Sequence, residues 1–226
     1  MPREWYCNGI SIQNQRPSNM DSVFYAQRGT ADSPLLLAVV CDGVGSTADG
    51  AFASGYCTRD LGQWFQQADE DRLGLALRDR VLKMNQEIIA AAKTEGLNTA
   101  TTLSALLIMG GGYVVVHAGD SRIYHCNEER LVCLTQDDVS DQGRLTACIG
   151  RWGDVIIHYE EGTVTDGVFL LCSDGLYKHV TETQIQSELR QVKGHWQKRA
   201  LERLLKMAVD QGETDNISAI LLQNRK

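Results

Sequence analysis

The sequence is poor in the features that mark fibrous, membrane-spanning and nucleic-acid-binding chains. Only three of its 226 residues are proline, all within the first 34. Its longest uninterrupted apolar runs, at 35–41 and 168–172, fall far short of the roughly 18 residues typical of a membrane span. Lysine and arginine number 22 against 29 for aspartate and glutamate, and this charge of −7 gives no counterion-release driving force toward DNA or RNA. We therefore expect neither a membrane nor a nucleic-acid partner.

The seven cysteines do not form a disulfide or zinc pattern. Their number is odd, no two are spaced as CxxC, and several lie inside apolar runs, where cysteine acts as a small hydrophobic side chain. Residues 1–6 contain no basic region followed by an apolar core, so no secretory signal is visible. These absences predict a cytoplasmic protein with reduced thiols.

What is present is typical of a globular protein. Hydrophobic residues make up 43% of the chain and charged residues 23%, which is close to ordinary globular usage. No repeat, low-complexity tract or linker divides the chain. We therefore expect one domain covering residues 1–226, and a monomer.

Several short apolar runs predict strands. The runs at 35–41 and 168–172 are continuous, as in strands buried on both faces, and each is followed by an acidic turn that contains Asp-Gly. Three consecutive glycines separate the runs at 103–109 and 113–117, which predicts a hairpin. Further strands are predicted at 121–125, 131–134 and 217–222.

Helical periodicity is found in other parts of the chain. Apolar residues recur every three or four positions over 72–94 and again over 196–208. A third helix is predicted at about 49–67, and 181–184 has the composition of a helix start. Strands in series together with separate helices predict an α+β domain in which helices cover antiparallel sheets.

Five aspartates lie at predicted strand ends or in the adjoining turns: Asp21, Asp42, Asp120, Asp174 and Asp215. Each one alone reads most simply as a turn residue, because Asp-Gly and Asp-Asn are common turn dipeptides. Together they also fit a metal site, because carboxylates brought close repel one another unless a cation neutralises them. Oxygen ligands of this kind favour Mg²⁺ or Mn²⁺ over Zn²⁺.

Six short segments resemble, in order and approximate spacing, the motifs of the metal-dependent protein phosphatases, the PPM or type 2C family of serine/threonine phosphatases. The segments are Arg-Pro-Ser-Asn-Met-Asp at 16–21, Val-Cys-Asp-Gly-Val-Gly at 40–45, Thr-Ala-Thr-Thr at 99–102, Gly-Asp-Ser-Arg at 119–122, Cys-Ser-Asp-Gly-Leu at 172–176 and Asp-Asn-Ile-Ser at 215–218. The resemblance covers about residues 9–222 and is to the compact bacterial form of the family.

The resemblance implies a fold and a site. The fold would be a central antiparallel β-sandwich flanked on both faces by pairs of helices, in four layers. Two Mn²⁺ or Mg²⁺ ions would bind to a set of ligands in which Asp42 bridges: Asp21, Asp42, the carbonyl of Gly43, Asp174 and Asp215. Arg16 would grip the substrate phosphate, a task that suits the planar fork of donors on a guanidinium group.

The resemblance also implies an activity. A hydroxide bridging the two ions would attack phosphoserine and phosphothreonine directly, in proteins phosphorylated by a serine/threonine kinase. Two other functions stay open on the sequence: a catalytically silent module of the same fold that binds phosphoproteins or a regulator, and a metal-dependent hydrolase of small phosphate esters. The intact Arg16 and the four aspartate ligands favour the protein phosphatase.

Two departures from the family pattern bear on the site. Lys178 stands where the family often has an aspartate that joins Asp120 in binding a third ion, so a third ion is expected to bind weakly or not at all, or the amine to replace part of its charge. The segment 135–149 is short where relatives carry a flap over the active site, which predicts an open cleft. Deletion of residues 137–142 is then expected to change small-substrate turnover very little.

Overall fold

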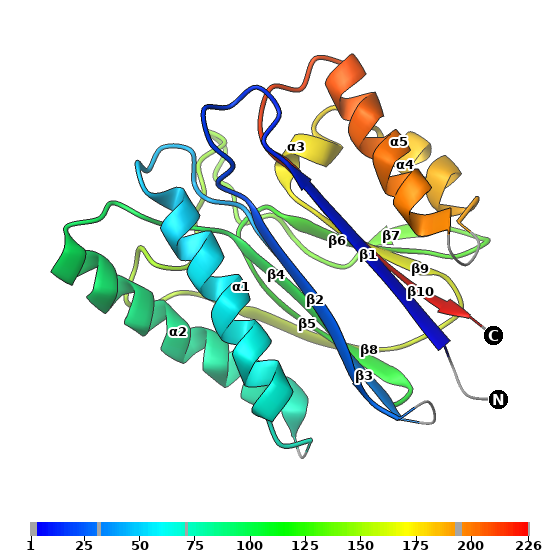
Figure 1. Cartoon of the computed structure of the whole chain (residues 1–226), viewed down its shortest axis with the longest axis horizontal. Helices are drawn as coiled ribbons and strands as arrows, with labels where there is room; N and C mark the ends of the chain where they lie inside the picture. Colours follow the sequence, from blue (N-terminus) through cyan, green and yellow to red (C-terminus); the bar gives the residue numbers. More distant parts are fainter. Residues whose placement is uncertain (1–3, 31–32, 71, 193–195, 226) are drawn as a thin grey trace.

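Two five-stranded antiparallel sheets form the centre of the computed structural model, which describes residues 4–30, 33–70, 72–192 and 196–225 (Figure 1). The first sheet has the order β1 (Glu4–Ile12), β10 (Ile217–Arg225), β9 (Val168–Cys172), β6 (Arg122–Cys126) and β7 (Leu131–Cys133). The second has the order β2 (Ser22–Gly29), β3 (Pro34–Cys41), β4 (Leu103–Met109), β5 (Gly112–Ala118) and β8 (His158–Thr163).

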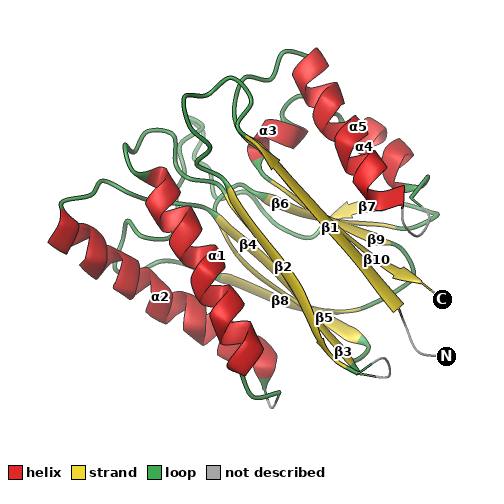
Figure 2. Cartoon of the chain, in the orientation of Figure 1, coloured by secondary structure: helices red, strands yellow, loops and turns green. Residues whose placement is uncertain are grey.

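Helices cover the outer face of each sheet (Figure 2). The long pair α1 (Gly50–Gln67) and α2 (Leu73–Glu95) packs on the second sheet, and α4 (Glu182–Leu189) and α5 (Gln197–Asp210) pack on the first. A one-turn helix, α3 (Asp174–Tyr177), follows β9 directly. This is the α+β, four-layer arrangement that the sequence predicts.

Strand β3 shows how the layers are held together. Leu35, Leu37 and Val39 are buried against the helices α1 and α2, whereas Leu36 and Ala38 are buried between the two sheets. Successive side chains of a strand point to opposite faces, so a strand that is apolar at every position can serve two cores at once. The continuous apolar run at 35–41 is therefore explained by its central place in the sandwich.

Most predicted elements are confirmed within one or two residues. The strands at 103–109 and 168–172 have the predicted limits, and the helix start predicted at 181–184 is a capping box, in which Thr181 and Gln184 bond to each other's backbone amides. Strands β1, β2 and β8 were not predicted, because all three mix polar and apolar residues at an edge of a sheet. No helix in the described part of the chain is both long enough and apolar enough to span a bilayer.

Candidate metal and phosphate site

Loops at one end of the two sheets bring four of the candidate aspartates together. Asp42 directly follows β3 and Asp21 directly precedes β2, and the first residue of β2 pairs with the last residue of β3. On the other sheet, Asp174 begins α3 just after β9, and Asp215 lies two residues before β10. Antiparallel pairing places the start of one strand beside the end of its neighbour. Acidic residues distant in the sequence therefore meet at the same end of each sheet.

A serine joins the two halves of the site. The hydroxyl of Ser173 donates a hydrogen bond of 2.9 Å to Oδ2 of Asp21 and accepts one of 3.0 Å from the amide of Ser218. Asp21 belongs to the loop before the second sheet, whereas both serines belong to the first sheet or its loops. This buried contact links the loop before β2 to the loop after β9 at the site.

Burial, and then mutual repulsion, raises the pKa values of three of these carboxyl groups. Burial raises the pKa of Asp42 well above its usual range, and the negative charges of Asp21, Asp174 and Asp120 raise it further. Burial likewise raises the pKa of Asp21 to about 6, although the hydroxyls of nearby serines lower it in part. Burial and Asp174 raise the pKa of Asp120 to about 6. The site therefore holds more negative charge than its surroundings stabilise.

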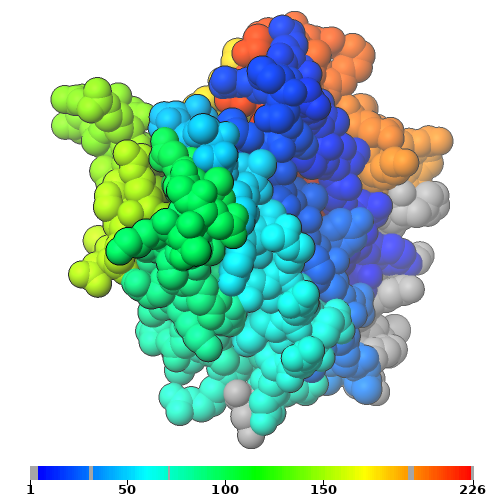
Figure 3. Space-filling model, turned by 60° about the vertical axis from the view of Figure 1, so that its left-hand side comes forward, coloured from blue at the N-terminus to red at the C-terminus, as the bar shows by residue number. Residues whose placement is uncertain are grey.

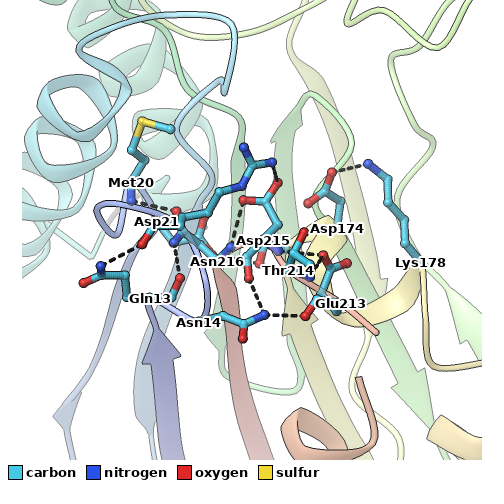
Figure 4. Close-up of polar contacts among 12 residues, drawn as sticks. Gln13, Asn14, Met20, Asp21, Asp174, Lys178, Glu213, Thr214, Asp215 and Asn216 are labelled. Atoms are coloured by element: carbon cyan, nitrogen blue, oxygen red, sulfur yellow. Dashed lines mark hydrogen bonds and ion pairs between the residues drawn. The ribbon is translucent and has the colours of Figure 1, made fainter. Parts of the chain in front are cut away.

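Two cationic side chains contact this cluster (Figure 4). Nη2 of Arg16 lies 2.5 Å from Oδ2 of Asp215, and the ammonium group of Lys178 donates a hydrogen bond to Asp174. Burial lowers the pKa of Lys178, but the neighbouring carboxylates outweigh burial and raise it overall. The site is thus rimmed by one guanidinium group, from the loop between β1 and β2, and by one ammonium group, from the C-cap of α3.

The donor set fits hard divalent cations in its chemistry. All of the side chains are carboxylates, and their mutual repulsion is the kind of strain that a divalent cation relieves. As placed, however, no three His, Cys, Asp or Glu side chains among the described residues converge tightly enough to share one ion. Asp174 and Asp215 instead turn toward Lys178 and Arg16.

Gly43, the fifth predicted ligand, lies in a tightly packed turn. A Cβ atom at this position would come within 2.7 Å of the carbonyl oxygen of Met20 and within 2.8 Å of the backbone of Gly50, at the start of α1. Any side chain here would push the turn away from α1. Glycine therefore allows the turn that carries Asp42 to pack against the loop that carries Asp21.

Two asparagines that the sequence analysis assigned no role hold the Arg16 loop in place (Figure 4). Asn14 donates hydrogen bonds to the carbonyls of Glu213 and Asp215, at 2.7 and 3.0 Å. Asn216 donates to the carbonyl of Gln13 at 2.8 Å and accepts from the amide of Met20 at 2.9 Å. Asn216 follows Asp215 in a motif and could have been singled out, whereas nothing local marks Asn14.

The short segment at 135–149 anchors the Asp120 loop, so the expectation that deleting residues 137–142 changes little needs correction. Asp137 makes a two-point ion pair with Arg122, at 2.9 and 2.7 Å. Asp138 accepts from the amide of Gly119 at 2.9 Å, and its own amide donates to the carbonyl of Gly119 at 2.7 Å. Only the tip of the segment, around residue 140, projects from the molecule (Figure 3).

Known protein phosphatases resemble this chain in sequence. The sequence model for protein phosphatase 2C matches residues 11–210. The serine/threonine protein phosphatase PstP of Mycobacterium tuberculosis is 29% identical over 234 residues, which cover 91% of this chain and 42% of the relative. The chain therefore spans less than half the length of that relative.

Solved structures share the fold over nearly the whole chain. The crystal structure of the catalytic domain of the serine/threonine protein phosphatase PstP, in complex with two manganese ions, superposes with a TM-score of 0.83. It is 27% identical, and the match covers 99% of this chain and 100% of that one. The serine/threonine phosphatase Stp1 of Staphylococcus aureus, at 20% identity, has a TM-score of 0.89 and is covered to 96%, with 99% of this chain.

Proposed function

The chain belongs to the protein phosphatase 2C family, and on that premise we propose that it is a metal-dependent phosphatase that hydrolyses phosphoserine and phosphothreonine in proteins. The observation that carries the proposal is the meeting of Asp21, Asp42 and Asp174 at one end of the sandwich, with Arg16 beside them. Substrates would be proteins phosphorylated by a serine/threonine kinase.

We propose that two divalent cations, Mn²⁺ or Mg²⁺, bind this cluster. Asp42 is the central ligand, because it lies close enough to Asp21 and Asp174 for both charges to raise its pKa. Asp21 precedes a strand of the second sheet and Asp174 follows a strand of the first. Asp215 and the carbonyl of Gly43 complete the proposed set. Two bound cations would supply a water molecule of lowered pKa as the nucleophile and would neutralise charge on the phosphoryl oxygens.

Arg16 is the proposed phosphate-binding residue. Its loop is tied to the chain before β10 by Asn14 and Asn216, so the guanidinium is carried at the rim of the carboxylate cluster. Its side chain is 43% exposed, which leaves it accessible to a phosphate group arriving from solvent. A guanidinium can donate to two phosphate oxygens at once and so orient the phosphorus atom toward the cluster.

Lys178 bears on the number of ions. Its ammonium group faces Asp174, Asp120 and Asp42, which a third ion near Asp120 would also have to approach. A tethered positive charge repels a divalent cation at short range. We therefore propose a two-ion centre in which Lys178 takes the place of a third ion. The cytoplasmic location and the monomeric state stay predictions.

Turnover with and without metal tests the proposed function. Hydrolysis of p-nitrophenyl phosphate and of a phosphothreonine peptide is measured with Mn²⁺, with Mg²⁺ and with chelator. We expect metal-dependent activity on both substrates, lost in Asp174→Asn and kept in the control Asp210→Asn, whose carboxylate lies on the exposed end of α5.

The same assay separates the alternatives. No activity under any condition would favour a silent binding module of the same fold. Activity on a small phosphate ester far above that on phosphopeptides would favour a metabolite phosphatase. Activity that chelator leaves unchanged would contradict the metal centre itself.

A further inference from the structure

A buried threonine hydroxyl joins the two loops that carry Asp42 and Asp120. Oγ1 of Thr102 accepts a hydrogen bond of 3.0 Å from the amide of Asp42 and lies 2.7 Å from Oγ of Ser121, the residue after Asp120. Thr102 is 1% exposed and Ser121 is fully buried. Water does not reach this hydroxyl pair, so it cannot replace these hydrogen bonds when one of the hydroxyls is removed.

The main chain of Asp42 is held on its other side as well. The carbonyl of Asp42 accepts from the hydroxyl of Thr101 at 2.9 Å and from the amide of Thr102 at 2.8 Å. The amide of Asp42 is therefore bonded to Thr102, and its carbonyl to both Thr101 and Thr102. These bonds hold the main chain of Asp42 in place behind its carboxylate.

Thr102 also packs against the second loop. Gly119 has φ = +114°, and a Cβ atom there would lie 2.7 Å from Cβ and Cγ2 of Thr102. The carbonyl of Ser121 accepts from the hydroxyl of Ser104 at 2.7 Å. The turn containing Asp120 is thus pressed onto Thr102 on one side and bonded to Ser104 on the other.

The two loops need such a connection because their carboxylates repel. Burial raises the pKa of Asp42, and Asp120 is one of the negative charges that raise it further. Hydrogen bonds between buried groups at a fixed spacing oppose the separation of two like charges.

We propose that Thr102 is a positioning residue of the metal centre: its hydroxyl, bonded to Asp42 and Ser121, holds the Asp42 loop at a fixed spacing from the Asp120 loop and so places the ligand Asp42 for cation binding. This role rests on the proposed metal-dependent function. Loss of a residue that hydrogen-bonds to a metal ligand and orients it typically weakens metal binding by roughly 10–100-fold.

The test is the affinity for Mn²⁺ in the absence of substrate, measured by isothermal titration calorimetry. Thr102→Val keeps the shape of the side chain and removes the hydroxyl, and we expect it to weaken Mn²⁺ binding by roughly 10–100-fold. Thr102→Ser restores the hydroxyl, and we expect affinity within about threefold of the wild type.

Thr99→Val is the matched control. Thr99 is a buried threonine three positions earlier whose hydroxyl accepts from the amide of Ala53 and donates to the carbonyl of Asp49, away from the aspartate loops. Equal Mn²⁺ affinity in Thr99→Val and Thr102→Val would overturn the role of Thr102 while leaving the metal centre in place. Failure of Thr102→Ser to restore affinity would also overturn it.

Two further outcomes are distinguishable. If Thr102→Val does not fold, Ser121→Ala removes the partner hydroxyl with a smaller change. We expect it to weaken Mn²⁺ binding severalfold, and unchanged binding would refute the proposal. Wild-type protein that binds no Mn²⁺ would overturn the metal centre together with the role of Thr102.

Discussion

Lys178 donates a hydrogen bond to Asp174, four residues earlier in the chain. Asp174 begins the one-turn helix α3 and Lys178 is its C-cap residue, so the helical repeat places the two side chains one above the other. One of the proposed metal ligands is thereby paired with a cation from the end of its own helix.

Replacing this cation with a carboxylate should strengthen metal binding. In Lys178→Asp, an ammonium group is lost and a further oxygen ligand is gained beside Asp120. We expect Mn²⁺ affinity to rise about tenfold, or one more ion to bind, as read by calorimetry. The control is Lys206→Asp, which breaks a similar i,i+4 pair with Asp210 on α5. A Mn²⁺ dependence of turnover identical to that of the wild type would contradict the role given to Lys178.

Removing Arg16 should affect substrate more than metal. In Arg16→Ala, a guanidinium that can donate twice to phosphate is lost, and we expect kcat/KM for a phosphothreonine peptide to fall roughly 10–100-fold. Mn²⁺ affinity should stay within a few fold, because Arg16 is not a ligand. Arg203→Ala, which breaks an exposed pair with Glu188, is the control. An equal loss of metal affinity would show that Arg16 acts chiefly by holding Asp215.

Asp138 should matter more than the tip of its segment. Asp138→Ala removes the acceptor of the Gly119 amide and of the His158 ring, at 2.9 and 2.7 Å. We expect a loss of roughly 1–3 kcal/mol in the free energy of unfolding, measured with urea. Asp141→Ala, at the exposed tip, should change it by less than about 0.5 kcal/mol. Equal effects would contradict the anchoring role of Asp138.

The same contacts revise the expected result of deleting residues 137–142. That deletion removes both Asp137 and Asp138, and with them the partners of Arg122 and Gly119. We expect it to reduce activity toward p-nitrophenyl phosphate strongly, whereas shortening the tip by Asp141 and Gln142 alone should leave turnover close to the wild type. Turnover assays on the two deletions separate these outcomes.

His117 should make the fold less stable in mild acid. It is fully buried, and burial lowers its pKa below the ordinary value of 6.5 although the charge of Asp138 acts in the opposite direction. Between the two pKa values the unfolded chain binds more protons than the folded one, so stability falls as pH drops through about 6.5.

Urea unfolding of the wild type and of His117→Gln between pH 5 and 8 tests this sign. Groups that titrate equally in both proteins cancel in the difference, so we expect the wild type to lose more stability than the variant as the pH falls. A greater loss in the variant would mean that His117 is stabilised as the cation, through Asp138 and the carbonyl of Gln136.

The sequence by itself determined the elements and the candidate carboxylates. Hydrophobic period distinguishes the strand at 35–41 from the helix at 72–94 because it depends only on neighbours a few residues apart. The acidic turns after β3 and β9 were visible for the same reason, and the order of the six motifs identified the family. Polar edge strands such as β8 lack this signal, so they were missed.

Only the tertiary structure decided which charges and hydroxyls meet. The contact between Asp21 and Ser173 joins residues 152 positions apart, and that between Arg16 and Asp215 joins residues 199 apart. Thr102 reaches both Asp42 and Ser121 because neighbouring loops pack at one end of the second sheet. Such contacts depend on strand register and on the packing of two sheets, which no local pattern encodes. Hydrophobic periodicity, in contrast, depends only on residues a few positions apart.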